Sequence, residues 1–319
     1  MNLQGVINTI KIFSGIKKAF GLPNAIKYIY YFRLWYGHRM KAHKYINMVL
    51  NILQTDMSGF IKSFDYENQQ NLSESRLIWI CWWQGEESMP PICRSFFEKI
   101  KKNVSEGWEV QLITKDNYSE YVKIPPHIID KHRSGIIKIQ QFSDILRQAL
   151  LYQNGGLWMD ITLFTLPGFL RTVKTDLPFW SANLGKIIKN NQIGQILTGC
   201  RWSSFLQYGK KGNMINKFVF EGMCRYYMNH DITIDYFLQN YFIRLGYESI
   251  VEMRNIIDSI PINNPHLYDL SLCINEPFNN IKWTEITEDT KIYKLTYKIS
   301  YNEFVNNEPT FYHHIITIR

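Results

Sequence analysis

The chain has 319 residues, of which 45% are hydrophobic and 15% aromatic, and this composition excludes an intrinsically disordered protein. Its five cysteines include no C-x-x-C pair, which argues against a zinc site or a disulfide framework and favours a reducing, cytosolic setting. No apolar run reaches the roughly 20 residues that cross a bilayer, and the first residues lack the features of a signal peptide.

The first 55 residues hold the whole formal excess of +8, because they contain no acidic residue before Asp56. Their basic residues are Lys11, Lys17, Lys18, Lys27, Arg33, Arg39, Lys41 and Lys44. Aromatic and aliphatic residues lie between these charges at spacings of short amphipathic helices, with a break near Gly21-Leu22-Pro23. We therefore expect residues 1–75 to form a basic helical segment.

This basic pattern allows more than one partner. Lysines beside aromatic residues suit an anionic lipid surface, and we expect residues 1–55 to touch a membrane. Nucleic acid could use the same charges, although we expect none as a partner. An equally good interpretation is a helical extension that packs on the main domain with its lysines in water.

The main domain is expected to begin near Arg76. Apolar runs at 76–83 and 108–114 predict buried strands, and the segment 92–103 between them predicts a helix. Strands and helices that alternate in this way indicate a mostly parallel α/β sheet. Ligands of such sheets lie beyond the carboxyl ends of the strands, which places residues 83–85 and 114–117 near a ligand site.

Residues 140–164, "QQFSDILRQALLYQNGGLWMDITLF", combine a helix and a strand with unusual charges. We expect Ser143 to cap the helix and the Gly155-Gly156 pair to end it. Asp144 and Arg147 are three residues apart, so they lie together on one helix face. Each feature alone has an ordinary structural explanation, such as a surface ion pair, but their combination predicts a binding site.

The strand that follows is expected over 157–163, with Trp158, Asp160 and Thr162 on one face and apolar residues on the other. A carboxylate in such a strand is costly to bury. Something must therefore meet Asp160, although this residue taken alone could simply cap the next turn.

This stretch closely resembles the S-D-x-x-R … G-G-x-x-x-D-x-D element of sugar transferases with the GT-A fold. These include the family 32 type related to yeast mannosyltransferases and, more distantly, the glucosylating domains of large clostridial toxins. The nearest likeness is to bacterial capsular polysaccharide synthesis proteins, and it extends through "IWICWWQGEESMPPI", "VQLITKDNYSEYV", "IPPHIIDKHRSG" and "KLTYK". The resemblance implies a GT-A-like, Rossmann-type nucleotide-sugar-binding domain over residues 76–319.

The resemblance also implies roles for single residues. Asp144 and Arg147 would hold hydroxyls of the donor sugar, and Asp160 would contact the ribose or sugar and the metal shell, so these three are the expected catalytic residues. Trp83 of the W-x-G motif would stack on the nucleotide base, beside Trp82. The further donor-binding candidates are Gly85, Asn117, Gly155, Gly156, Trp158 and Lys298.

Thr162 departs from the family pattern, since it replaces the second aspartate of D-x-D, which is usually the direct metal ligand. A hydroxyl is a weaker ligand for a hard cation, so Mn²⁺ or Mg²⁺ is bound through fewer charges or is dispensable. Asn240 and the pair His313-His314 are candidates to complete the metal site. Lys298 and Arg201 are candidates for positive charge opposite the donor diphosphate.

The expected reaction is transfer of a sugar from a nucleotide sugar, with UDP favoured, to a growing capsular or other surface polysaccharide on a lipid-linked or oligosaccharide acceptor. The family resemblance implies retention of the anomeric configuration. A helical region over 218–247 would cover the acceptor side, and the protein would work in the cytoplasm at the inner face of the cell membrane. Two alternatives are a sugar-phosphate transferase and a catalytically decayed assembly component.

Overall fold

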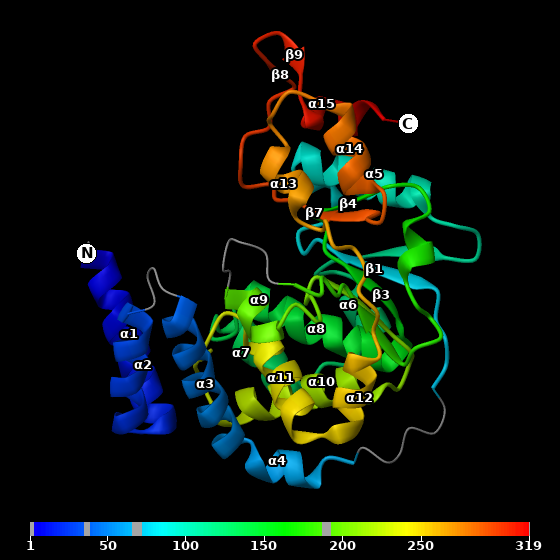
Figure 1. Cartoon of the computed structure of the whole chain (residues 1–319). Coiled ribbons are helices and arrows are strands. Elements are labelled where there is room, and N and C mark those ends of the chain that lie inside the picture. The colour runs from blue at the N-terminus through cyan, green and yellow to red at the C-terminus, as the bar shows by residue number, and fades with distance from the viewer. Residues whose placement is uncertain (1–2, 35–38, 66–71, 187–192, 319) are drawn as a thin grey trace.

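The computed structural model describes residues 3–34, 39–65, 72–186 and 193–318 (Figure 1). Parts of the expected basic segment, namely residues 1–2, 35–38 and 66–71, lie outside these ranges. Among the described residues, no helix is both long and apolar enough to span a bilayer.

A five-stranded sheet in the order β2-β1-β3-β6-β5 forms the centre of the molecule. Strand β1 pairs in parallel with both β2 and β3, whereas β6 runs antiparallel to β3 and β5. Only β6 is therefore reversed, which confirms the predicted mostly parallel α/β sheet. The strands are β1 Leu77–Cys81, β2 Glu109–Ile113, β3 Gly156–Met159, β5 Phe179–Ser181 and β6 Leu206–Gly209.

Helices flank this sheet (Figure 1). The segment between β1 and β2 forms a helix as predicted, and the expected helical region over 218–247 is confirmed as two consecutive helices whose aromatic residues are largely buried. The helices are α5 Pro91–Asn103, α6 Tyr118–Tyr121, α7 Pro126–Arg133, α8 Ile139–Asn154, α9 Ile193–Thr198, α10 Met214–Asn229, α11 Leu238–Ser249 and α12 Val251–Asp258.

The C-terminal part packs beside the sheet around a small core of its own, which includes Phe96, Phe164 and Tyr293. Here β4 (Leu163–Thr165) pairs antiparallel with β7 (Ile292–Lys294), so residues far apart in the sequence, such as Leu163 and Lys294, become neighbours. Figure 1 shows this part in orange and red. Its other elements are α13 Asp269–Cys273, α14 Asn280–Thr287, β8 Phe304–Val305, β9 Glu308–Pro309 and α15 Phe311–Thr317.

The N-terminal segment is helical, as predicted, and it packs on the main domain. The expected helix break lies at Gly21, whose φ of 85° ends the first helix. Tyr28 donates a hydrogen bond to the Ile234 carbonyl, and Tyr45 donates one to Asp235 at 2.7 Å. These buried contacts fix the segment to the chain that leads into α11. The helices are α1 Leu3–Phe20, α2 Leu22–Leu34, α3 Arg39–Asp56 and α4 Ser58–Ser63.

Candidate functional site

A cleft of about 860 Å³ opens beyond the carboxyl ends of β1 and β3. Its walls come from segments that are far apart in the sequence, so only the folded chain creates it. The lining includes residues 81–84 at the end of β1, Ser143, Asp144 and Arg147 of α8, Asp160 after β3, Gln195 and Thr198 of α9, residues 202–205 before β6, Tyr236, Phe237 and Asn240 around the start of α11, and residues 294–297 from the end of β7. This position agrees with the rule that parallel sheets bind ligands beyond the carboxyl ends of their strands.

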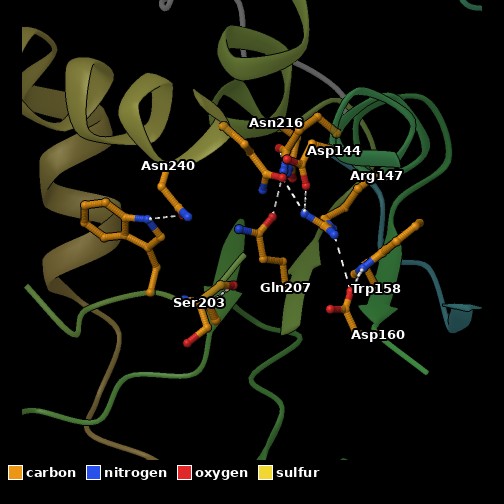
Figure 2. Close-up of polar contacts among 12 residues, drawn as sticks. Asp144, Arg147, Trp158, Asp160, Ser203, Gln207, Asn216 and Asn240 are labelled. Atoms are coloured by element: carbon orange, nitrogen blue, oxygen red, sulfur yellow. Dashed lines mark hydrogen bonds and ion pairs between the residues drawn. The ribbon is translucent and has the colours of Figure 1, made fainter. Parts of the chain in front are cut away.

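Asp144, Arg147 and Asp160 meet on one wall of this cleft. Arg147 Nη1 lies 2.7 Å from Asp144 Oδ1, and Arg147 Nη2 lies 3.3 Å from Asp160 Oδ1. Figure 2 shows the guanidinium between the two carboxylates. The predicted neighbourhood of Asp144 and Arg147 and their convergence with Asp160 are therefore both seen in the structure.

The local fold around these residues differs in detail from the expectation. Helix α8 begins at Ile139, one turn before Ser143, so Ser143 lies inside the helix and is not its cap. The expected strand over 157–163 is two strands, because the chain turns between Met159 and Leu163. In this turn Asp160 N–H donates to the Phe205 carbonyl and Leu163 N–H donates to the Asp160 carbonyl. Asp160 therefore leaves the sheet and its carboxylate enters the cleft.

Lys294 is a site residue that the sequence analysis missed. Its Nζ donates to Asp160 Oδ2 at 3.0 Å and to Thr162 Oγ1 at 2.6 Å. The register of β4 against β7, in which Leu163 faces Lys294, sets this position. The ammonium also lies 4.6 Å from the centre of the Phe205 ring. The motif "KLTYK" contains both Lys294 and Lys298, and the sequence alone does not show which of the two reaches the site.

The two carboxylates differ in their pKa values because their partners differ. Burial raises the pKa of Asp144 to about 6, and the charge of Arg147 offsets burial only in part. Burial also acts on Asp160, but the charges of Lys294 and Arg147 hold its pKa below the usual value. Asp160 is therefore a firmly ionised anchor, whereas Asp144 changes charge in the mildly acidic range.

Several buried groups hold Arg147 in place. Its guanidinium stacks over the Trp158 ring at 4.7 Å, and Nη1 also donates to Gln239 of α11. Trp158 is almost completely buried and donates through Nε1 to Asp160 Oδ1 at 3.0 Å. Trp158 was expected to touch the donor. In the structure it is buried and contacts Arg147 and Asp160, so it holds these two charged side chains in position. Among the described residues, Arg147 Nε has no hydrogen-bond partner.

Trp82 and Trp83 line the cleft, as expected for residues that contact the donor. Trp82 Nε1 donates to Ser88 Oγ at 2.8 Å, and its ring meets Tyr297 edge-on. The Trp83 ring is supported from behind by a cluster with Tyr118, His132 and Phe142. Supported and half-buried, Trp83 offers a fixed surface on which a flat base could stack.

The glycine pair lies away from the cleft. Gly155 precedes β3 and Gly156 is its first residue, whereas Asp160 follows the strand, so the length of β3 separates the pair from the site. Both have positive φ, 72° and 105°, and a Cβ on Gly156 would lie 2.4 Å from the Leu77 carbonyl oxygen. These glycines end α8 and let β3 approach β1 closely, and neither lines the cleft.

Gly85 and Asn117 lie in loops at the carboxyl ends of their strands but do not line the cleft. The Asn117 side chain accepts from Thr114 N–H and donates to the Leu112 carbonyl, so it is used to hold its own loop. Gly85, with a φ of 89°, supplies the turn after the tryptophans.

Of the remaining candidates, one lines the cleft and the others lie outside it. Asn240 lines the cleft and accepts from Trp202 Nε1 at 3.2 Å. Lys298 is exposed and outside the cleft, and Arg201 pairs with Asp258 at 3.4 Å. The two histidines lie on α15, where His313 faces Glu303 at 3.4 Å and His314 stacks on Phe278. The structure therefore does not bring His313 or His314 to Asp160.

The residues at Asp160 fit an ammonium better than a divalent cation. Thr162 Oγ1 and Asp160 Oδ2 both accept from Lys294, and Asp160 Oδ1 accepts from Arg147 and Trp158. Within the described ranges, no group of three or more His, Cys, Asp or Glu side chains is placed to hold a metal ion. Mg²⁺ and Mn²⁺ prefer several anionic or neutral oxygen ligands, and here the oxygens already bind cationic groups. The expectation of Mn²⁺ or Mg²⁺ stays a prediction.

The fold and the site define this chain as an α/β protein with a charged cleft at the carboxyl ends of its parallel strands. The profile of a family described as capsular polysaccharide synthesis protein matches residues 32–315, so the chain belongs to that family. A comparison with curated proteins finds no match. Membership supports a role in the biosynthesis of capsular polysaccharide and confirms the nearest resemblance seen in the sequence.

Proposed function

We propose that the chain is a glycosyltransferase that moves a sugar from a nucleotide-sugar donor to a growing capsular or other surface polysaccharide. The observation that carries this proposal is the convergence of Asp144, Arg147 and Asp160 in a large cleft beyond the carboxyl ends of β1 and β3. Two carboxylates fixed by a guanidinium suit the recognition of sugar hydroxyls, which donate and accept hydrogen bonds.

The donor is proposed to lie across the cleft, with UDP-sugars favoured. Its base would stack on Trp83, and its sugar would meet Asp144 and Arg147. Lys294 and Arg147 supply positive charge where the diphosphate would lie. The acceptor, lipid-linked or an oligosaccharide, would enter beside Asn240 and the first turn of α11.

Retention of configuration is proposed to follow a front-face route. Of the described residues that line the cleft, the acidic ones are Asp144 and Asp160, and both are bound by cationic groups. Neither is free to attack the anomeric carbon. The bond from this carbon to the diphosphate would break with its electron pair on the diphosphate oxygen. The acceptor oxygen would bond on the same face, and its proton would go to the departing diphosphate.

The N-terminal helices are proposed to hold the enzyme at the inner face of the cell membrane. Ile10, Leu22, Ile26 and Tyr30 are exposed on α1 and α2, and Lys11, Lys17, Lys18 and Lys27 are exposed beside them. We call these eight residues the basic-apolar face. Exposed apolar groups beside lysines suit a surface of anionic lipid.

Product analysis tests the proposed reaction. The protein is incubated with each nucleotide sugar, and the released nucleotide is identified by chromatography. Release of a nucleoside diphosphate, together with a sugar retained by acceptor or water, is the expected result. Release of a nucleoside monophosphate would replace the proposal with sugar-phosphate transfer, and tight donor binding without any release would indicate an assembly component.

A further inference from the structure

We propose that Lys294 takes the place of a divalent cation, so that its ammonium binds the donor diphosphate and donor binding needs no metal. This inference rests on the proposed function, because it concerns the diphosphate of a nucleotide sugar. It assigns to Lys294 a direct contact with the donor.

The position of the ammonium carries the inference. Lys294 Nζ bridges Asp160 and Thr162, the two ends of the D-x-T sequence, at 3.0 and 2.6 Å. A cation bound by two aspartates at these same positions would have to occupy the space between them. Thr162 is buried, and its hydroxyl accepts from Lys294, so both positions hold the ammonium.

The charges of the two arrangements are equal. Two carboxylates with a dication are neutral together, and one carboxylate with a hydroxyl and one ammonium are neutral too. Thr162 and Lys294 therefore compensate each other, whereas a dication added beside the ammonium would be repelled by it. In this proposal, threonine at position 162 and lysine at position 294 together replace an aspartate and a dication, so Thr162 does not mark a site that has lost its function.

The ammonium keeps the capacity to bind a ligand. A lysine has three donors, and among the described residues two of them are used by Asp160 and Thr162. Lys294 lines the cleft, with the Phe205 ring against it. Arg147 lies on the other side of Asp160 and also lines the cleft. A diphosphate oxygen between these two side chains would meet both positive charges.

Calorimetric titration with UDP, and in parallel with GDP and CDP, tests this inference. The whole protein is titrated in excess EDTA and then in Mn²⁺. We expect one nucleotide to bind in EDTA, with an affinity that Mn²⁺ changes by less than about threefold. Lys294→Met should weaken this binding at least about tenfold, whereas Lys294→Arg should keep most of it because the positive charge remains.

Lys291→Met is the matched control, since Lys291 belongs to the same segment but bonds to the Thr287 carbonyl outside the cleft. It should bind as the wild type does. If Lys294→Met does not fold by circular dichroism, the metal dependence of the wild type and the affinity of Lys294→Arg decide. Binding that requires Mn²⁺, or unchanged binding by a folded Lys294→Met, would overturn this inference alone. No binding of any nucleotide in either condition would overturn it together with the proposed function.

Discussion

Arg147 joins the two carboxylates of the cleft and is itself almost fully buried. A buried guanidinium is stable only with its charge compensated, and the two partly buried carboxylates supply that compensation. Arg147 therefore stabilises the fold and, in the proposed function, also recognises the donor.

Replacing Arg147 by methionine should lower the free energy of unfolding by about 3 kcal/mol, because the partly buried Asp144 loses its ion-pair partner. Urea unfolding measures this change. Arg201→Met is the control, since Arg201 is exposed, where it pairs with Asp258 and lies over the Tyr247 ring, and it should change stability by less than about 0.5 kcal/mol. Equal losses for both variants would contradict the buried network.

The raised pKa of Asp144 predicts how stability depends on pH. Its pKa is about 6 in the folded protein and about 3.9 in an unfolded chain, so folding favours the protonated form. The stability that this group contributes is full below about pH 4 and is lost as the pH rises through about 6. Relative to Asp144→Asn, the wild type should lose about 3 kcal/mol of unfolding free energy between these limits. A difference that does not vary with pH would contradict the raised pKa.

At the residue scale, the sequence predicted the acidic and basic residues of α8 and β3 but not their partners. Asp144 and Arg147 follow from helical spacing alone, and Asp160 from a break in an apolar pattern. Lys294 and Gln239 reach the site from distant elements, and spacing carries no information on such contacts. Lys294 and Lys298 lie in one motif. They differ because Lys294 is the last residue of β7, whereas Lys298 lies beyond the strand.

At the scale of elements, the junction of α8 with β3 determines how closely β3 can approach β1. Gly156 pairs next to β1 at a φ of 105° and leaves no space for a side chain beside Leu77. Asp160 follows the last residue of this strand and enters the cleft. The close packing of Gly156 therefore fixes the strand that leads to Asp160.

Gly156→Ala should destabilise the protein by about 3 kcal/mol or more, because the added Cβ meets backbone and the φ is unfavourable for alanine. Thermal or urea unfolding checks this. Gly59→Ala in α4, where nothing lies within 4 Å of the added atom, should be neutral or stabilising by up to about 1 kcal/mol. A Gly156→Ala variant as stable as the wild type would contradict this close packing of Gly156 against β1.

The order of the elements in the main domain was predictable, and their ends were less so. Apolar runs gave β1 and β2, and the helices α5, α10 and α11 followed from length and pattern. The single strand expected over 157–163 was wrong, because Leu163 N–H bonds back to the Asp160 carbonyl and closes a turn there. Alternation in the sequence continues through such a turn and does not reveal it.

On the scale of the whole molecule, the basic-apolar face and the cleft belong to one folded unit. Buried bonds of Tyr28 and Tyr45 tie the N-terminal helices to the residues just before α11, whose first turn lines the cleft. A membrane bound by α1 and α2 would therefore hold the cleft at a fixed orientation to a lipid-linked acceptor.

Charge reversal on this face tests membrane contact. Lys17→Glu with Lys18→Glu should reduce sedimentation with phosphatidylglycerol vesicles at least about tenfold, since each lysine near an anionic surface contributes about 1 kcal/mol. Lys102→Glu with Lys174→Glu is the matched control on exposed lysines elsewhere, and it should bind nearly as the wild type does. Equal losses in both pairs would indicate attraction by net charge alone.

A thermal-shift screen of nucleotide sugars asks most directly whether the cleft binds a donor. A donor at about a hundred times its Kd stabilises the native state by about 2.7 kcal/mol, which raises the Tm by several degrees. We predict such a shift with one donor, present in EDTA and lost in a folded Asp160→Asn variant. A screen in which no donor raises the Tm, or a shift that Asp160→Asn retains in full, would contradict a donor site at Asp144, Arg147 and Asp160.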